Sequence, residues 1–252
     1  MTYLVHTSHA QLAAHWLGFV GWTFIAVAVG SIQWRVWQVS DIGVITSGKA
    51  WVGIWRVCFN SHTLVTPEFK VMYCRSISLT DTFTPPEIAA AQVLMLLALI
   101  VGLCGNAGSI YALRNVYLGL DKSLPIRSVF AASGALCLLA AAMSLVPLLW
   151  NLSSVVTNKT VRFPPDFHMP EVPEEQYVGS SIGLGIIGAA LMTTSGVIFL
   201  TYRLPARSRH RTHPSLREQV HPEGSASPGH ESGTMTNSRG RDNPAFESHE
   251  HS

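Results

Sequence analysis

Four long stretches of the sequence contain no Asp, Glu, Lys or Arg, and they constrain the fold more than any other feature. They are residues 1–34, 88–113, 128–157 and 176–202. A helix needs about 20 predominantly apolar residues to cross a hydrocarbon layer of roughly 30 Å. The apolar parts of these stretches are long enough for that. The sequence therefore predicts an all-α bundle of four transmembrane helices, with spans near residues 13–33, 89–113, 129–150 and 178–202.

Two alternatives to four retained spans fit the sequence less well. In a soluble protein, helices of this length normally have a polar face. These stretches carry no charge, and only 13% of the residues in the whole chain are charged. The first stretch could be a cleaved signal peptide, with Ala26-Val27-Ala28 resembling a cleavage site. However, no Lys or Arg precedes it, and its apolar run exceeds the 7–15 residues of a signal peptide.

The placement of basic residues predicts the orientation, because Lys and Arg are enriched in short cytoplasmic loops. Arg114, Lys122 and Arg127 lie between the second and third spans, and four arginines open the segment after the fourth. We therefore expect a cytoplasmic N-terminus (1–12), a four-span domain (13–202) with outer loops at 34–88 and 151–177, and a cytoplasmic tail (203–252). The tail is rich in Ser, Gly, His and Pro, a composition typical of disorder.

Polar and small residues inside the spans predict helix packing rather than transport. Ion and proton pathways usually place charged groups in the membrane, and these spans have none. Asn106 is expected to make a hydrogen bond between helices. Small residues allow helices to approach closely, within the bundle or between chains. They recur as Gly102, Gly105 and Gly108 in the second span, and as a GxxxG spacing, Gly179 to Gly183, followed by Gly185 and Gly188 in the fourth.

The first outer loop is expected to form a small antiparallel sheet from three candidate strands, two of which, the first and the third, alternate their residues between two faces with the period of a strand. These segments are 32–36, 52–59 and 69–76. Cys58 and Cys74 are the two cysteines outside the spans. A pair in an oxidising compartment favours a disulfide, which would stabilise the loop by roughly 3 kcal/mol.

The sequence offers no support for an enzyme, a metal site or a nucleic-acid partner. A catalytic thiol needs a histidine and an orienting carboxylate, and only His62 lies near the cysteine pair. His6, His9 and His15, near the start of the first span, lack acidic or cysteine neighbours, and no basic stripe with interleaved aromatics occurs. We expect no cofactor. In the second outer loop Asn158 is the better of two glycosylation-type triplets, because Asn151 adjoins the membrane.

The chain resembles the claudin family of tight-junction proteins in topology and in one motif. The motif is Trp34, then Gly53-Ile54-Trp55, then Cys58 and Cys74, where the family has Gly-Leu-Trp in the second block. The similarity runs from about residue 16 to 203. Three shorter segments also match: Val44-Ile45-Thr46-Ser47 before Trp51, Met72-Tyr73-Cys74-Arg75, and Phe167-His168-Met169-Pro170, which resembles the family's Phe-Tyr-Asn-Pro.

Three departures from the family pattern mark an atypical member. The segment between Cys58 and Cys74 is longer than usual. Gln92 stands where claudins commonly carry an arginine, and Glu250-His251-Ser252 differs from the Tyr-Val ending that binds PDZ scaffolds.

The resemblance implies a left-handed four-helix bundle with an extracellular sheet held by a Cys58–Cys74 disulfide. It also implies a multi-pass plasma-membrane protein of tight junctions that associates with claudin-like chains within one membrane and across cells. Such an assembly forms a paracellular barrier or a weakly selective pore. Further expected partners are membrane lipid and, through the tail, cytoplasmic junction proteins. The alternative is an accessory tetraspan subunit that regulates a channel or receptor in its own membrane.

Two sets of residues are candidates for the junction function. Phe167, His168, Met169 and Pro170 are candidates for contact with the facing cell. Five basic and four acidic residues in the first outer loop nearly balance, so the loop charge predicts neither a cation channel nor an anion channel. Arg75, beside the second cysteine, is the candidate for disfavouring cations.

Overall fold

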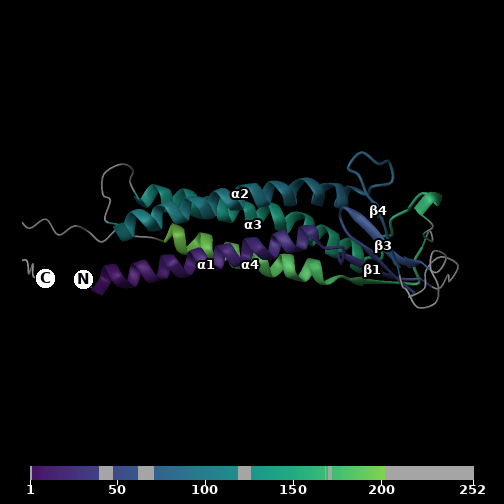
Figure 1. Ribbon diagram of the computed structural model, residues 1–252, viewed down its shortest axis with the longest axis horizontal. Coiled ribbons are helices and arrows are strands. Elements are labelled where there is room, and N and C mark those ends of the chain that lie inside the picture. The colour runs from purple at the N-terminus through teal and green to yellow at the C-terminus, as the bar shows by residue number, and fades with distance from the viewer. Residues whose placement is uncertain are drawn as a thin grey trace, which may run out of the picture. The chain divides into compact units, whose positions relative to one another are not determined.

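The computed structural model describes residues 2–39, 48–61, 71–118, 126–167, 169 and 172–201. Four long helices make up most of this part of the chain: α1 (Thr2–Gly30), α2 (Pro86–Leu118), α3 (Ile126–Val156) and α4 (Ser180–Leu200). They lie side by side along their length (Figure 1). Each is long and apolar enough to cross a membrane, which confirms the predicted bundle of four spans.

The helix ends differ from the predicted spans. α1 begins at Thr2 and α3 continues to Val156, both outside the apolar runs used for prediction. α2 begins at Pro86, as expected for a residue that has no N–H to leave unpaired in a first helical turn. At the end of α3, Asn151 and Ser154 are buried. The apolar pattern therefore stops before the helix does. The predicted tail lies outside the described residues.

Small residues hold the helices together, although not at the predicted GxxxG pair. A Cβ added to Gly188 of α4 would lie 2.7 Å from the carbonyl oxygen of Gly21 in α1, and one added to Gly21 would lie 2.6 Å from that of Gly188. A Cβ added to Gly183 would meet nothing within 4 Å. Within this chain Gly183 therefore makes no close helix contact, and the predicted close approach occurs at Gly188 of the same glycine series. Packing of Gly183 between chains stays a prediction. In α2, Gly105 packs against Cys137 of α3, as predicted for this glycine series.

The hydrogen bond predicted between Asn106 and another helix is also wrong. Its side-chain nitrogen donates to the Gly102 carbonyl one turn earlier in α2, at 3.0 Å. Within the described chain, its side-chain oxygen accepts no hydrogen bond. The own-helix carbonyl is the nearer acceptor for a short side chain. The polar links between α1 and α2 come instead from Trp22, which donates to the Leu99 carbonyl at 2.9 Å, and from His15 with Ser109.

A five-stranded antiparallel sheet stands at one end of the bundle (Figure 1). Its strands lie in the order β4-β3-β2-β1-β5. Their bounds are β1 Arg35–Gln38, β2 Lys49–Val52, β3 Arg56–Ser61, β4 Val71–Ser76 and β5 Glu175–Val178. The sheet therefore joins both segments that connect the helices at this end, and its edge strand β5 leads directly into α4.

The predicted sheet is confirmed, but its strands differ in detail. The first predicted strand, 32–36, shifts to Arg35–Gln38. The second, 52–59, is interrupted, because it takes in only the last residue of β2 and the first four residues of β3. The division falls at Gly53, whose N–H donates to the Arg56 carbonyl at 2.9 Å and closes a tight turn. β5 was not predicted, because its four residues follow a proline-rich stretch and owe their conformation to pairing with β1.

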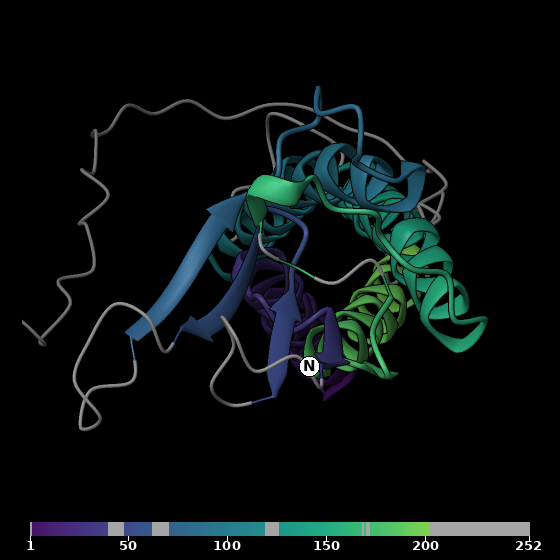
Figure 2. The same ribbon diagram turned by 90° about the vertical axis from the view of Figure 1, so that its right-hand side faces the viewer.

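One hydrophobic core continues from the helices into the sheet. It includes Ile25 and Ala28 of α1, Leu148 of α3, and Trp37 and Phe59 of the sheet, all nearly or fully inaccessible to solvent. The segment between α3 and α4 crosses the same end of the molecule and carries a short 3-10 helix, η1 (Pro165–Phe167) (Figure 2). The sheet is therefore packed on the bundle and covered by this segment.

Candidate functional site at the sheet end of the bundle

The two cysteines predicted to pair form a disulfide between β3 and β4. Cys58 and Cys74 are direct partners in the strand register, and their Cα atoms are 4.1 Å apart. Cys58 is buried and Cys74 is exposed. A cross-link over this separation stabilises the folded hairpin by roughly 3 kcal/mol on the chain-entropy model. The disulfide therefore holds the outer edge of the sheet to its buried interior.

Gly53, Ile54 and Trp55 form the turn between β2 and β3, and the turn is pressed against the end of α1. A Cβ on Gly53 would lie 3.0 Å from the Ile32 Cα and 3.1 Å from the Ser31 carbonyl oxygen, so a larger residue would push the turn away. Ile54 is fully buried. Trp55 accepts a hydrogen bond from the Ile77 N–H at 2.7 Å. This motif block thus anchors the sheet to the bundle.

Gln92 of α2 fastens the same turn from the other side. Its side-chain nitrogen donates to the Ile54 carbonyl at 2.6 Å and to the Ile77 carbonyl at 3.0 Å. Gln92 is 2% exposed. Without its side chain, each of these two carbonyls would lose a hydrogen-bond donor in a buried position. One amide group therefore ties α2 to the motif turn and to the end of β4. The sequence revealed Gln92 only as a departure from the family pattern.

Trp34, the first residue of the motif, joins α1 to the start of α4. It is buried, and its indole N–H donates to the Ala28 carbonyl at 2.8 Å. Its own carbonyl accepts from the Gly179 N–H at 2.9 Å. A Cβ on Gly179 would overlap the Gln33 carbonyl. This position therefore requires glycine for a close approach, which is not the helix-packing role predicted from the GxxxG spacing.

A buried ion pair connects the sheet to α2 and α3. The Arg35 guanidinium of β1 lies 3.0 Å from Glu87 Oε1 and donates to Asn151 Oδ1 at 2.9 Å. Ser154 donates to the same Glu87 oxygen at 2.7 Å, and Asn151 donates to the Glu87 main-chain carbonyl at 2.8 Å. Burial lowers the pKa of Arg35, while the hydrogen bond and the charge of Glu87 oppose that effect. We call Arg35, Glu87, Asn151 and Ser154 the polar network.

The selectivity candidate Arg75 is half-buried and lies over an aromatic ring. Its guanidinium carbon is 4.9 Å from the centroid of Phe167, within the range of a cation–π contact. Phe167 packs in turn against Phe83 and Phe163, with ring centroids 5.1 and 5.4 Å away, and Trp37 lies 5.5 Å from Phe163. Arg75, in β4, is thus placed by the segment between α3 and α4.

The four residues predicted to contact a facing cell occupy different environments. Phe167 is only 8% exposed and belongs to the aromatic layer beneath Arg75. Met169 is half-buried. His168 and Pro170 lie outside the described residues. Contact with a facing cell therefore stays a prediction for this segment. Phe167 is buried beneath Arg75 and packs inside the segment instead of lying on its surface.

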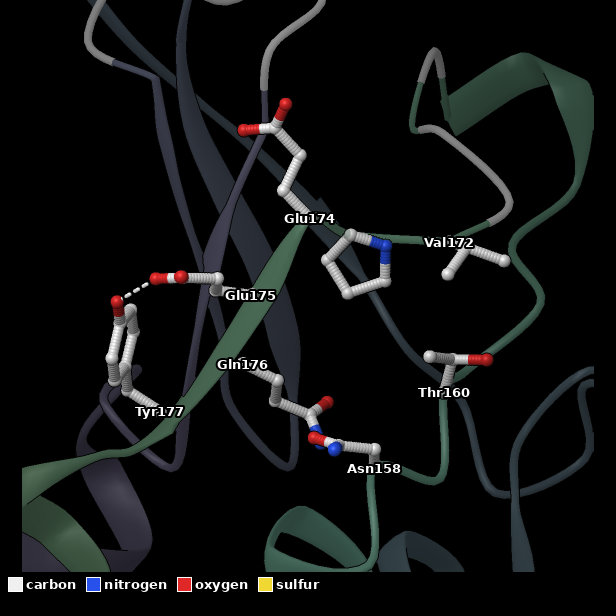
Figure 3. Close-up of a pocket in the computed structure, with 8 residues that line it drawn as sticks. Asn158, Thr160, Val172, Glu174, Glu175, Gln176 and Tyr177 are labelled. Atoms are coloured by element: carbon white, nitrogen blue, oxygen red, sulfur yellow. Dashed lines mark hydrogen bonds between the residues drawn. The ribbon is translucent and has the colours of Figure 1, made fainter.

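Asn158 lies at the C-terminal end of α3, on the rim of an open groove (Figure 3). The other lining residues named in Figure 3 are Thr160, Val172, Glu174, Glu175, Gln176 and Tyr177. Tyr177 donates a hydrogen bond to Glu175, and this bond raises the pKa of the phenol.

Among the described residues, no three His, Cys, Asp or Glu side chains gather as a metal site would require.

Sequence reasoning missed most of the residues that hold this site together. In the sequence, Arg35 and Glu87 stand out only as loop charges and Asn151 only as part of a glycosylation triplet, yet in the fold they belong to the polar network. Phe83 and Phe163 were not singled out. A possible signal was the isolated charge pair at the two ends of one outer loop, since charges beside apolar spans are seldom buried without a partner.

Comparison with known proteins gives one consistent result. The family model described as PMP-22/EMP/MP20/Claudin tight junction matches residues 19–201, more than half of the chain. The chain is 26% identical to human Claudin-3 over 198 residues, covering 78% of this chain and 82% of the relative. It is 24% identical to human Claudin-4 over 182 residues (71% and 79%) and 25% identical to mouse Claudin-2 over 190 residues (75% and 76%). With four apolar helices and a disulfide-linked antiparallel sheet at one end, this chain belongs to the claudin family.

Proposed function

We propose that this chain is a structural component of tight junctions that associates with other claudin-like chains in its own membrane and across cells. In this proposal the sheet faces the paracellular space, where it contributes to a barrier or a weakly selective pore. Family membership supports a structural rather than an enzymatic role. We further propose that both termini are cytoplasmic, as the distribution of Lys and Arg predicts.

The observation that carries the proposal is the attachment of the sheet to the bundle. The motif turn, Gln92, Trp34 and the polar network fasten the sheet to all four helices. A surface that meets a second membrane should hold a fixed position relative to its own membrane. A mobile surface would lose conformational entropy on binding, and that loss would weaken the contact. A sheet held by buried hydrogen bonds meets that requirement.

The charges at the sheet end support weak rather than strong selectivity. Arg35 and Glu87 neutralise each other in the buried network and contribute little to the surface. The remaining loop charges stay nearly balanced in the sequence. Phe167 holds the guanidinium of Arg75 in place. A charge that is fixed beside a narrow path repels like-charged ions more effectively than a freely moving one.

The junction proposal can be tested in cells that lack tight junctions. We expect the expressed chain to concentrate at contacts between cells and to form strands in freeze-fracture images. The Cys58→Ser variant should neither concentrate at cell contacts nor form strands, because its β3–β4 hairpin loses the disulfide cross-link. Even distribution of the unaltered chain over the surface, without strands, would refute the proposal and favour an accessory subunit that acts within its own membrane.

The role of Arg75 can be tested by dilution potentials across an epithelial layer that expresses the chain. A unit charge about 4 Å from an ion in water changes its free energy by about 1 kcal/mol. Arg75→Gln should therefore raise sodium permeability and lower chloride permeability by up to about fivefold each, and so raise the sodium-to-chloride permeability ratio by up to about 30-fold, and less at high salt. Arg56→Gln is the matched control, because Arg56 is an exposed cation on the neighbouring strand β3. Equal effects of both variants would contradict a specific role for Arg75.

A further inference from the structure

We propose that Asn158 carries an N-linked glycan. The inference is independent of the proposed junction function, since it rests on the acceptor triplet and on the position of Asn158 in the fold. Asn158-Lys159-Thr160 has the Asn-x-Ser/Thr pattern that oligosaccharide transfer in the secretory pathway requires. Because such triplets also occur by chance, the structural context decides whether this one can be used.

Asn158 lies on the same side of the bundle as the disulfide. Gln176 of β5 donates to the Val155 carbonyl at 3.2 Å, three residues before Asn158, and to the Lys159 carbonyl at 3.4 Å, one residue after it. β5 belongs to the same sheet as Cys58 and Cys74. Disulfides form in the oxidising lumen of the secretory pathway, where glycans are also attached. The disulfide therefore places Asn158 in the required compartment.

The backbone around Asn158 presents its side chain to solvent. The Lys159 N–H bonds to the Ser154 carbonyl at 2.9 Å and the Asn158 N–H to the Val155 carbonyl at 3.0 Å, the two bonds of a Schellman helix cap. Asn158 has the left-handed conformation that this cap needs, with φ of 53°. Its side chain is exposed. Capping alone also explains an asparagine here, so the test must separate capping from modification.

The second triplet in this segment is an internal contrast. Asn151 is fully buried, and its amide nitrogen donates to the carbonyls of Glu87 and Pro147 at 2.8 and 3.0 Å. A sugar on that nitrogen would break the polar network. A chain glycosylated at Asn151 could not adopt this fold, whereas a chain glycosylated at Asn158 can.

The surface beside Asn158 has room for the first sugars. The groove has a volume of about 470 Å³ and is open to solvent (Figure 3). Thr160, Pro173 and Tyr177 are among its lining residues. β5 is an edge strand of the sheet, and exposed edges invite pairing with another chain. A glycan over this groove shields the β5 edge and leaves β4 as the accessible edge.

The chemistry balances with one co-reactant, a lipid-pyrophosphate-linked oligosaccharide. The Asn158 side-chain nitrogen forms a bond to the first sugar carbon, and the bond from that carbon to the pyrophosphate oxygen breaks. The nitrogen loses one proton, and the lipid pyrophosphate leaves with the electron pair of the broken bond. No oxidant or reductant takes part.

The experiment is glycosidase treatment of the full chain expressed in mammalian cells, read as a mobility shift on a gel. We expect one shift in the unaltered chain and in Ser153→Ala, and none in Thr160→Ala or Asn158→Gly. Asn158→Gly keeps the left-handed cap, so surface biotinylation should show normal delivery of that variant. Absence of a shift in the unaltered chain, or a shift that survives Thr160→Ala, would overturn the proposal. Contact localisation of the chain is scored separately and bears only on the junction function.

Discussion

Replacing Glu87 by alanine will leave a buried positive charge without its partner. The side chains of Arg35 and Glu87 are 1% and 8% exposed, and the charged groups are 3.0 Å apart. Removing one member of such a pair costs about 3–5 kcal/mol, because the other charge stays desolvated. Since the total stability of a folded domain is about 5–15 kcal/mol, we expect Glu87→Ala to lose a large part of it and to be retained inside the cell.

A double variant separates the lone charge from the loss of packing. Arg35→Met with Glu87→Met removes both charges and keeps long apolar side chains in their place. Its remaining cost is the loss of hydrogen bonds to the Asn151 oxygen and from the Ser154 hydroxyl, about 1–3 kcal/mol for a buried polar group left unpaired. The double variant should therefore be more stable than Glu87→Ala alone.

The assay is thermal unfolding of the purified chain in detergent, followed by tryptophan fluorescence. Arg56→Ala is the control, since an exposed cation should change the free energy of unfolding by about 0.5 kcal/mol or less. Two results would refute the reasoning: a Glu87→Ala chain as stable as the unaltered one, or a double variant less stable than the single variant.

Three further predictions follow from the contacts of the sheet and bundle. Gln92→Leu should cost about 2–4 kcal/mol, because two buried carbonyls lose their donor; unchanged thermal stability would contradict this. Gly188→Ala should lower the melting temperature and Gly183→Ala should not, since only the former meets a neighbouring backbone; equal shifts would refute that packing. Cys58→Ser should cost roughly 3 kcal/mol while all four spans still insert, as protease protection of the membrane-embedded chain can show.

The number of helices was predictable from the sequence, but their ends were not. A membrane span requires a long uncharged apolar run, so each run marks a helix almost independently of its neighbours. The ends depend on tertiary contacts. α3 reaches Val156 because Asn151 and Ser154 find partners on β1 and α2, and no local pattern indicates those partners.

The sheet shows the same division between local and distant causes. The Cys58–Cys74 pairing followed from compartment and cysteine count. The break between β2 and β3 did not, because the turn at Gly53 is pressed against the backbone at Ser31 and Ile32. β5 lies far from β1 in the sequence, and only their pairing makes this short segment a strand.

The candidate site residues were identified singly and without their relations. Arg75 was predicted for ion selectivity and Phe167 for contact across cells, yet the two side chains touch. Gln92 was noticed as a departure from the family, but its bonds to the motif turn required the fold. Sequence patterns identify residues of the right chemical type, while their joint placement depends on contacts between distant segments.

The most direct test of the central claim is a mixed culture of junction-free cells, of which only some express the chain with a fluorescent label. If the sheet-bearing surfaces meet across cells, the label will be enriched at borders between two expressing cells and not at borders with non-expressing ones. Equal label at both kinds of border would contradict association between chains on facing cells.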